Sequence, residues 1–254
     1  MNQQRPRAFV RDAADLLRVD GADALDLFHR IAASDVRAIE SGSFATVVFT
    51  DEKGRTIDAP VVHRRDDHLA LICGPTRGTA TRAWIERWVI TEDVTVSTLD
   101  ETVIEVLADD AHEASSFVVQ AAAIPDGFDV LDLEAWRAHF VRAGVVVAGP
   151  AVEMGPNPLE IGWRDRVSWT KGCYIGQEVV ARLDTYDKVK RDVARLRTNP
   201  EVSAGATLRI GAKKVGVVLD AVGSDALAVV DRSVDPSTEL EVQDGDGSGR
   251  ASIT

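Results

Sequence analysis

The chain has few of the features that mark secreted, disulfide-linked or metal-binding proteins. Its only two cysteines, Cys73 and Cys173, lie far apart, so a disulfide framework is not expected. Its five histidines form no HExxH or HxxxH pattern, and no CxxC pair occurs, so we expect no dedicated metal site. No apolar run approaches the roughly 18–20 residues of a membrane span, and the N-terminus lacks the apolar core of a secretory signal. We therefore expect a cytoplasmic protein with no membrane partner.

Lysine is also scarce, with 6 residues against 23 arginines, and 27 aspartates outnumber 14 glutamates at a net charge of -12. A carboxylate-rich, lysine-poor surface is typical of adaptation to high salt, where the self-repulsion of the charges is screened. A GC-rich genome, which favours arginine over lysine, would give the same composition. Under either interpretation, direct binding to nucleic acid is disfavoured, because it requires clustered basic residues.

What is present indicates a globular protein with a hydrophobic core, since 45% of the 254 residues are hydrophobic. The first 110 residues mix strands and helices without strict βαβ alternation, which favours an α+β fold. We expect a strand at residues 16–20 and a helix over 21–31 with Asp23 capping its start. A β-meander should follow at 44–73, with helices at 76–88, 112–124 and 131–144.

The sequence pattern changes after about residue 190, where short predicted strands alternate with turns of Gly, Asp, Ser and Pro. This pattern predicts a small β-barrel or sandwich. We place the boundary near residues 198–200, and we divide the chain into an α+β region of two units, possibly discontinuous in sequence, at 1–195 and a C-terminal barrel at 196–254. The last residues, 244–254, are expected to be partly disordered because of their glycine-rich composition.

The most unusual stretch is WTKGCYIGQEVVAR, residues 169–182, which places Cys173 between Gly172 and Gly176. If a helix begins at about Ile175, both its N-terminus and the charge of Lys171 would favour the reactive thiolate. The alternative is a small buried residue in a glycine-tight turn, and spacing alone leaves both readings open.

Two further features of the sequence bear on this stretch. Glu178 and Arg182 are spaced as an i, i+4 pair on the predicted helix. Cys73 ends the apolar run HLALIC and is interpreted as an inert core residue.

KGCYIGQEVVAR closely resembles the signature of the YgfZ-type folate-binding proteins, which are relatives of the T-protein (aminomethyltransferase) of the glycine cleavage system. The flanking segments PLEIGWRDRVSWT and DKVKRDVARLR are similar to those of the family, and GADALDLFHRIAASDV resembles its first helix and turn, with Asp35 as the aspartate. The core positions of the signature all match: Lys171, Gly172, Cys173, Tyr174, Gly176, Gln177, Glu178 and Arg182.

The resemblance implies a T-protein-like α+β fold, with two interleaved units around a central channel and a C-terminal small β-barrel. It implies tetrahydrofolate in that channel, with the Cys173 motif at the edge of the channel and Cys173 and Lys171 as the reactive residues. It also implies iron–sulfur client or assembly proteins as partners. Trp136 is expected to contact the folate, although a core aromatic paired with Phe140 is an equal alternative. The remaining folate-binding candidates are Asp35, Tyr174, Gln177, Glu178 and Arg182.

Two departures from the T-protein pattern bear on the chemistry. In the turn that carries the T-protein's paired acids, this chain has Asp58 followed by Ala59, and Arg142 replaces a glutamate that holds the pterin. Proton transfer at a folate nitrogen requires a positioned carboxylate. The sequence therefore favours a folate-binding accessory protein for iron–sulfur proteins. The alternatives are a folate-dependent aminomethyltransferase or other one-carbon transferase, with Asp58 or Asp35 as its acid, and a binding module without either chemistry.

Overall fold

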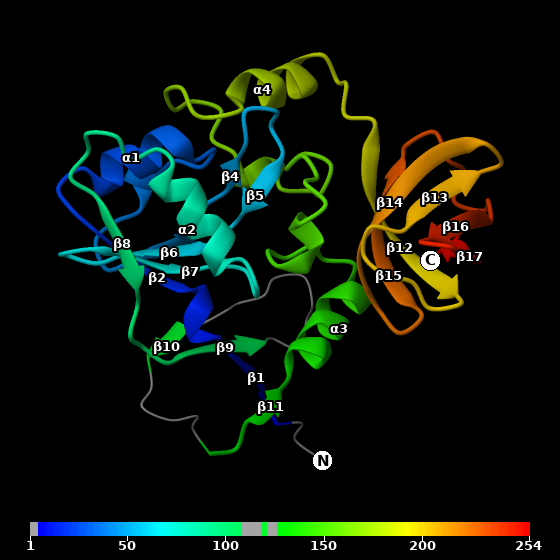
Figure 1. Cartoon of the computed structure of the whole chain (residues 1–254), viewed down its shortest axis with the longest axis horizontal. Helices are drawn as coiled ribbons and strands as arrows, with labels where there is room; N and C mark the ends of the chain where they lie inside the picture. Colours follow the sequence, from blue (N-terminus) through cyan, green and yellow to red (C-terminus); the bar gives the residue numbers. More distant parts are fainter. Residues whose placement is uncertain (1–4, 108–117, 121–125) are drawn as a thin grey trace.

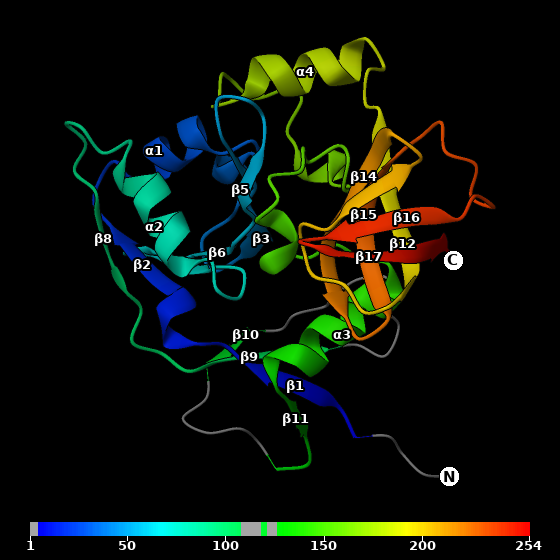
Figure 2. The same ribbon diagram turned by 45° about the vertical axis from the view of Figure 1, so that its right-hand side comes forward.

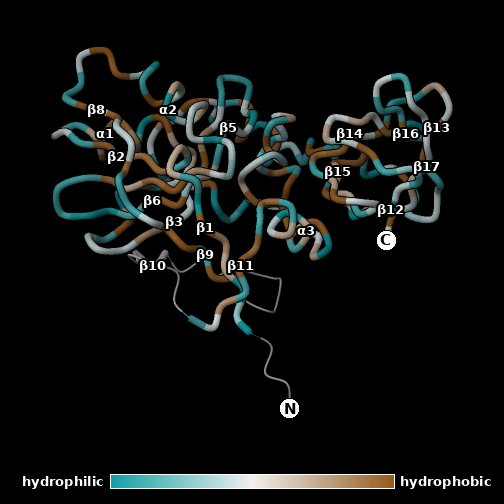
Figure 3. The backbone as a smooth tube through the Cα atoms, turned by 60° about the horizontal axis from the view of Figure 1, so that its bottom comes forward, coloured by the Kyte–Doolittle hydropathy of each residue, from teal (hydrophilic) through white to brown (hydrophobic). Residues whose placement is uncertain are grey.

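The computed structural model describes residues 5–107, 118–120 and 126–254. It consists of an α+β part built on two sheets and of a barrel that forms a separate lobe (Figure 1). In Figure 3, hydrophobic segments of the chain concentrate in the interiors of the two lobes, whereas many of the outer loops are hydrophilic. No helix in the described ranges has the length and apolar character required to cross a membrane.

The first sheet has five strands in the order β3-β6-β7-β2-β8, with helices α1 and α2 on one face (Figure 1). Leu27, Phe28 and Ile31 of α1 are fully buried against this face, as the helical spacing predicts. The elements are β2 (Leu16–Asp20), α1 (Ala24–Ile31), β3 (Phe44–Thr46), β6 (Val61–Arg64), β7 (Leu69–Ile72), α2 (Gly78–Glu86) and β8 (Thr95–Thr98). A separate two-stranded ribbon consists of β4 (Phe49–Thr50) and β5 (Thr56–Asp58).

The second sheet interleaves with the first in sequence. Strand β1 (Arg7–Val10) lies between β9 (Val103–Leu107) and β11 (Asp129–Leu131), antiparallel to β9 and parallel to β11. Strand β10 (Val118–Gln120) pairs with the other edge of β9. The chain therefore starts in the second sheet, builds the first, and then returns, which confirms the interleaved arrangement expected from the sequence.

Helix α3 (Leu133–Ala143) lies between the second sheet and the barrel (Figure 2). The Asp132 side chain caps its start by accepting a hydrogen bond from the Ala135 N–H at 2.7 Å. Gly144 ends the helix in the left-handed conformation at φ 77°, as predicted from its position. These two caps fix the register of the helix and therefore the direction of its side chains.

The C-terminal barrel closes in the strand order β12-β15-β14-β13-β16-β17, with β17 pairing back to β12. Its strands are β12 (Arg191–Asn199), β13 (Thr207–Ile210), β14 (Lys213–Val222), β15 (Asp225–Asp231), β16 (Leu240–Asp244) and β17 (Gly247–Ile253). The boundary expected at residues 195 and 196 falls inside β12. The barrel begins earlier because the first residues of that strand already pair with β15.

Three expectations about local structure are wrong. Residues 118–120 form a strand instead of part of a helix, and the rest of the expected helix at 112–124 lies outside the described residues. The C-terminus is ordered as β17, because pairing with both β16 and β12 compensates for its glycine content. Asp23 makes no side-chain cap to α1, and its carboxylate accepts from the Asp93 N–H instead.

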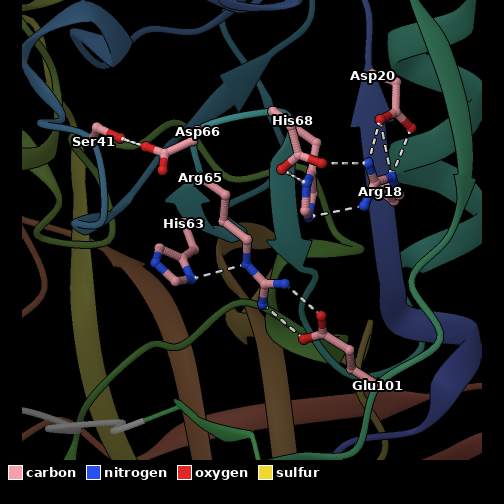
Figure 4. A network of polar contacts seen from close by, with 9 residues as sticks. Arg18, Asp20, Ser41, His63, Arg65, Asp66, His68 and Glu101 are labelled. Atoms are coloured by element: carbon pink, nitrogen blue, oxygen red, sulfur yellow. Dashed lines mark hydrogen bonds and ion pairs between the residues drawn. The ribbon is translucent and has the colours of Figure 1, made fainter.

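Polar side chains tie the strands of the first sheet to the loops around them (Figure 4). Arg18 of β2 binds Asp20 and also reaches Asp67 at 3.1 Å, while Arg65 pairs with Glu101. Because the Glu101 and Arg65 side chains are only 13% and 20% exposed, this pair is shielded from water better than an ordinary surface ion pair.

Strand β13 offers a direct test of the barrel core, because Leu208 is fully buried and Ile210 on the same strand is 40% exposed. We expect Leu208→Ala to destabilise the barrel by about 2–5 kcal/mol, because it removes buried methyl groups and leaves a cavity. Ile210→Ala should change stability by less than about 0.5 kcal/mol. Urea unfolding followed by circular dichroism measures both, and equal effects would contradict the packing described.

Candidate functional site

A cavity of about 300 Å³ lies where the two sheets, α3 and the segment before the cysteine motif meet. Its wall combines apolar side chains with a buried charged pair, and its residues come from positions far apart in the sequence. The lining residues are Arg11, Thr46, Ala59, Val61, Ile72, Gly74, Glu105, Trp136, Val145, Val147, Ala148, Asp165 and Arg166.

The charged pair on this wall consists of Arg11 and Glu105. Arg11 Nη2 lies 2.7 Å from Glu105 Oε2, and the two side chains are 9% and 5% exposed. In the β1–β9 ladder Phe9 is opposite Glu105, so these two side chains lie on the same face of the sheet. Residues two apart along a strand share a face, so Arg11 extends from that face as well. The Trp136 indole N–H donates to the same Oε2 at 3.2 Å.

Trp136 is both a core aromatic and a wall residue of the cavity. It is 1% exposed, and its ring centroid lies 5.4 Å from that of Phe9 and 4.8 Å from that of Phe140. The Arg11 guanidinium lies 5.2 Å from the centroid of the indole ring. The shared face with Phe140 is therefore confirmed, while the expected contact between Trp136 and folate stays a prediction.

Cys173 lies in a different place, a groove of about 580 Å³ next to the C-terminal end of α1. Its thiol is exposed, whereas Cys73 is fully buried, as expected for an inert core residue. The pKa of the Cys73 thiol is raised, mainly because the thiol is buried. No described residue lines both this groove, called here the thiol groove, and the central cavity. The thiol groove is lined by Asp26, His29, Arg30, Arg37, Gly172, Cys173, Tyr174 and Ile175.

Lys171 fastens the motif to α1. Its ammonium group donates to the backbone carbonyls of His29, Ala32 and Ser34, the last two at 2.6 and 3.1 Å. These acceptors lie at or just after the end of α1, so the lysine caps that helix end. Desolvation lowers the pKa of Lys171 to about 8. The contacts give Lys171 a structural role, and its expected effect on the thiol stays a prediction.

Asp35 and Tyr174 also belong to this side of the molecule. Asp35 accepts from the Arg37 N–H at 3.1 Å, and its Oδ1 lies 3.2 Å from His29 Nδ1. Desolvation and the charge of Lys171 lower the pKa of His29. Tyr174 is 7% exposed, and burial raises its pKa to about 12. Neither Asp35 nor Tyr174 lines the central cavity.

Helix α4 (Gln177–Thr185) follows the motif and begins two residues later than expected. Gly176 precedes it at φ 83°, and a Cβ there would lie 2.3 Å from the Asp51 carbonyl oxygen, so only glycine fits. Glu178 and Arg182 form the predicted i, i+4 ion pair at 3.0 Å, but both are largely exposed. Gln177, Glu178 and Arg182 all lie outside the wall of the central cavity.

Asp58 and Arg142, which lie at the two departures from the T-protein pattern, are also off the cavity wall, although Ala59 lines it. Asp58 is fully buried, and it accepts from Thr81 Oγ1 at 2.6 Å and from the Gly74 N–H at 3.3 Å. Desolvation raises its pKa. Arg142 is 66% exposed and pairs with Asp225 of the barrel at 3.2 Å. Both side chains therefore have structural contacts away from the cavity.

Sequence reasoning did not identify Arg11 and Glu105, the two charged residues most deeply placed in the wall. The only signal was a glutamate in the middle of the apolar run TVIEVLAD. In the described part of the chain, no three His, Cys, Asp or Glu side chains are grouped closely enough to hold a metal ion.

Comparison with known proteins gives relatives of low or local identity, and no family model matches the chain. A putative chloroplastic transferase of Arabidopsis thaliana is 43% identical over 60 residues, which are 24% of this chain and 14% of that protein. An uncharacterised protein of Haemophilus influenzae is 24% identical over 84% of this chain and 83% of its own length. A probable aminomethyltransferase of Natronomonas pharaonis is 25% identical over 88% of this chain and 63% of its own length.

Among solved structures, the aminomethyltransferase T of the glycine cleavage system from Bartonella henselae is similar over 98% of this chain and 85% of its own. The TM-score is 0.71 and the sequence identity is 16%. At this identity the similarity shows the fold alone. The chain therefore has the fold of glycine cleavage aminomethyltransferases, with two interleaved α+β units and a C-terminal barrel.

The two cysteines should differ sharply in reactivity, because Cys173 is exposed and Cys73 is fully buried. We expect an aromatic disulfide reagent to modify one thiol per native chain and two per chain in denaturant. Native Cys173→Ser should release no chromophore on the same timescale, whereas native Cys73→Ala should behave as wild type. Comparable rates for the two thiols in the native wild type would contradict the burial described.

Proposed function

We propose that this chain is a tetrahydrofolate-binding accessory protein that supports the assembly or maintenance of iron–sulfur proteins. The observation that carries the folate part is the central cavity of a T-protein fold, with a buried guanidinium in its wall. The cavity volume of about 300 Å³ is at the lower end of the range of about 300–1,000 Å³ that is typical of small-molecule sites.

The wall fits the head group of a folate. Val61, Ile72, Val145 and Val147 supply apolar surface for a flat ring. Arg11 Nε and Nη1 are buried and have no hydrogen-bond partner among the described residues. Buried donors are normally satisfied, so this guanidinium is suited to a ligand that brings acceptors into the cavity. Bound tetrahydrofolate would supply a carrier for one-carbon units.

The distribution of acids favours binding over aminomethyl transfer. Asp58 lies off the cavity wall and is held by Thr81 and Gly74, while its neighbour Ala59 lines the cavity. Glu105 is already bound by Arg11 and Trp136. A transferase needs a carboxylate that is free to manage a proton at the folate nitrogen. Asp58 does not meet that requirement, and Glu105 is engaged through Oε2 with Arg11 and Trp136, which leaves Asp165 as the other acid on the wall.

The iron–sulfur part of the proposal rests on the motif around Cys173. Its match to the YgfZ-type signature covers every core position, and the thiol is exposed in the thiol groove. An exposed thiol outside the central cavity is accessible to a protein partner, and a folate bound in the cavity would not cover it. This arrangement supports a division of labour, with folate in the cavity and client proteins at the thiol groove.

A one-carbon transferase is the second candidate, favoured by the fold similarity and by the name of the Natronomonas relative. Formaldehyde release or capture from an aminomethylated carrier protein, in the presence of tetrahydrofolate, distinguishes the two. Turnover in this assay would replace the accessory role with the transferase.

Folate binding can be measured by titrating the purified chain with tetrahydrofolate under anaerobic conditions and following tryptophan fluorescence. We expect a saturable change in the wild type, because Trp136 lines the cavity. Trp136→Phe should lose most of that change. The matched control Trp169→Phe should keep it, because Trp169 is 39% exposed and lies outside the wall. The absence of a saturable signal in the wild type, at both low and high salt and also by calorimetry, would refute folate binding.

The thiol role is tested in a strain that lacks the chromosomal copy of this gene. We expect wild type and Cys73→Ala to restore the activities of iron–sulfur enzymes. Cys173→Ser should restore less than about a tenth of the activity that the wild type restores. The expected difference follows from the motif around Cys173 and from the exposure of its thiol, since Cys73 is buried. Full rescue by Cys173→Ser at equal protein levels would show that the thiol is not required.

A further inference from the structure

The Arg11–Glu105 pair is arranged in an unusual way for a structural ion pair. Both side chains are more than nine-tenths buried, and their closest contact joins one atom of each, Nη2 and Oε2. The Trp136 N–H is directed to the same carboxylate oxygen. Burying two charges is costly unless their remaining hydrogen-bonding positions are also satisfied. Here the described protein satisfies only one side of the guanidinium.

The other side of the Arg11 guanidinium is buried without a hydrogen-bond partner among the described residues. Arg11 Nε and Nη1 have no partner among the described residues, and the contacts described for the Glu105 carboxylate, from Arg11 and Trp136, are both made to Oε2. Both residues line the central cavity. An arginine offers only donors and an ionised glutamate only acceptors. At this ion pair, the cavity wall therefore places the donors of Arg11 next to the acceptor of Glu105.

The charges of this pair restrict the class of ligand. A free carboxylate or phosphate would be attracted by Arg11 but repelled by Glu105. A cation would be attracted by Glu105 but repelled by Arg11. A neutral group that carries a carbonyl oxygen next to an N–H satisfies both residues at once. The lactam edge of a flat heterocycle has this pattern, and the apolar wall leaves room for its ring.

We propose that Arg11 and Glu105 form a recognition site for a lactam edge, with Arg11 donating to the carbonyl oxygen and Glu105 Oε1 accepting from the adjacent N–H. Building on the proposed function, this assigns the edge to the 4-oxo group and N3–H of the pterin. Trp136 then acts as a positioning residue, because its N–H holds Glu105 Oε2 and leaves Oε1 for the ligand.

The site is tested by competition against bound tetrahydrofolate with folic acid and aminopterin. These probes differ at position 4 of the pteridine, which is an oxo group in folic acid and an amino group in aminopterin. We expect folic acid to compete at least ten-fold better with the wild type, because the amino compound presents a donor to Arg11 and lacks the N3–H. This comparison does not depend on any variant folding.

Variants test the same site independently. Glu105→Gln is expected to weaken tetrahydrofolate binding at least ten-fold and to reduce the preference for folic acid to less than three-fold. The matched control is Glu101→Gln, because Glu101 is similarly buried and paired with Arg65 but lies outside the cavity wall. It should change either quantity by less than two-fold.

The outcomes separate this inference from the proposed function. If the wild type binds tetrahydrofolate but shows no preference for folic acid, or if Glu105→Gln binds as the wild type does, the recognition site is wrong while folate binding stands. If the wild type binds no folate at all, the proposed function fails, and the assignment of the edge to a pterin fails with it.

Discussion

The pairing of β1 between β9 and β11 is the constraint on which the central cavity depends. It brings the N-terminal segment to residues near position 105 and then directs the chain into the first sheet. The Arg11 N–H bonds to the Val103 carbonyl at 2.9 Å, which fixes the backbone from which the guanidinium extends. Since α3 packs on the same sheet, Trp136 reaches the carboxylate of Glu105. Any shift in this register would separate the three side chains.

The structure separates two features that the sequence placed together. The signature around Cys173 suggested a single site in which the motif borders the folate channel. Instead, Lys171 attaches the motif to the end of α1, and Gly176 holds it against the β4–β5 turn. The cavity and the thiol groove therefore have separate walls within one compact α+β region. A small molecule and a protein partner could then bind at the same time without competing for the same atoms.

Local patterns predicted much of the fold. The strand at residues 16–20 and the helix containing Phe28 follow from periodicity, and the ends of α3 follow from Asp132 and Gly144. Arg11 and Glu105 could not be predicted in this way, because only a contact between distant segments makes their burial tolerable. For the same reason, β17 was not expected, since its stability comes from its two neighbouring strands and not from its own residues.

Ser34 connects the two separated sites through its own hydrogen bonds. Its hydroxyl donates to the Arg166 carbonyl at 2.7 Å, and its carbonyl accepts from Lys171 at 3.1 Å. Arg166 lines the central cavity, whereas Lys171 belongs to the motif that carries Cys173. If a ligand in the cavity displaces the backbone at 166, the acceptor of the lysine moves with it. If this movement changes the affinity for a partner at the thiol groove, thermodynamic reciprocity requires that the partner change the affinity for the ligand by the same factor.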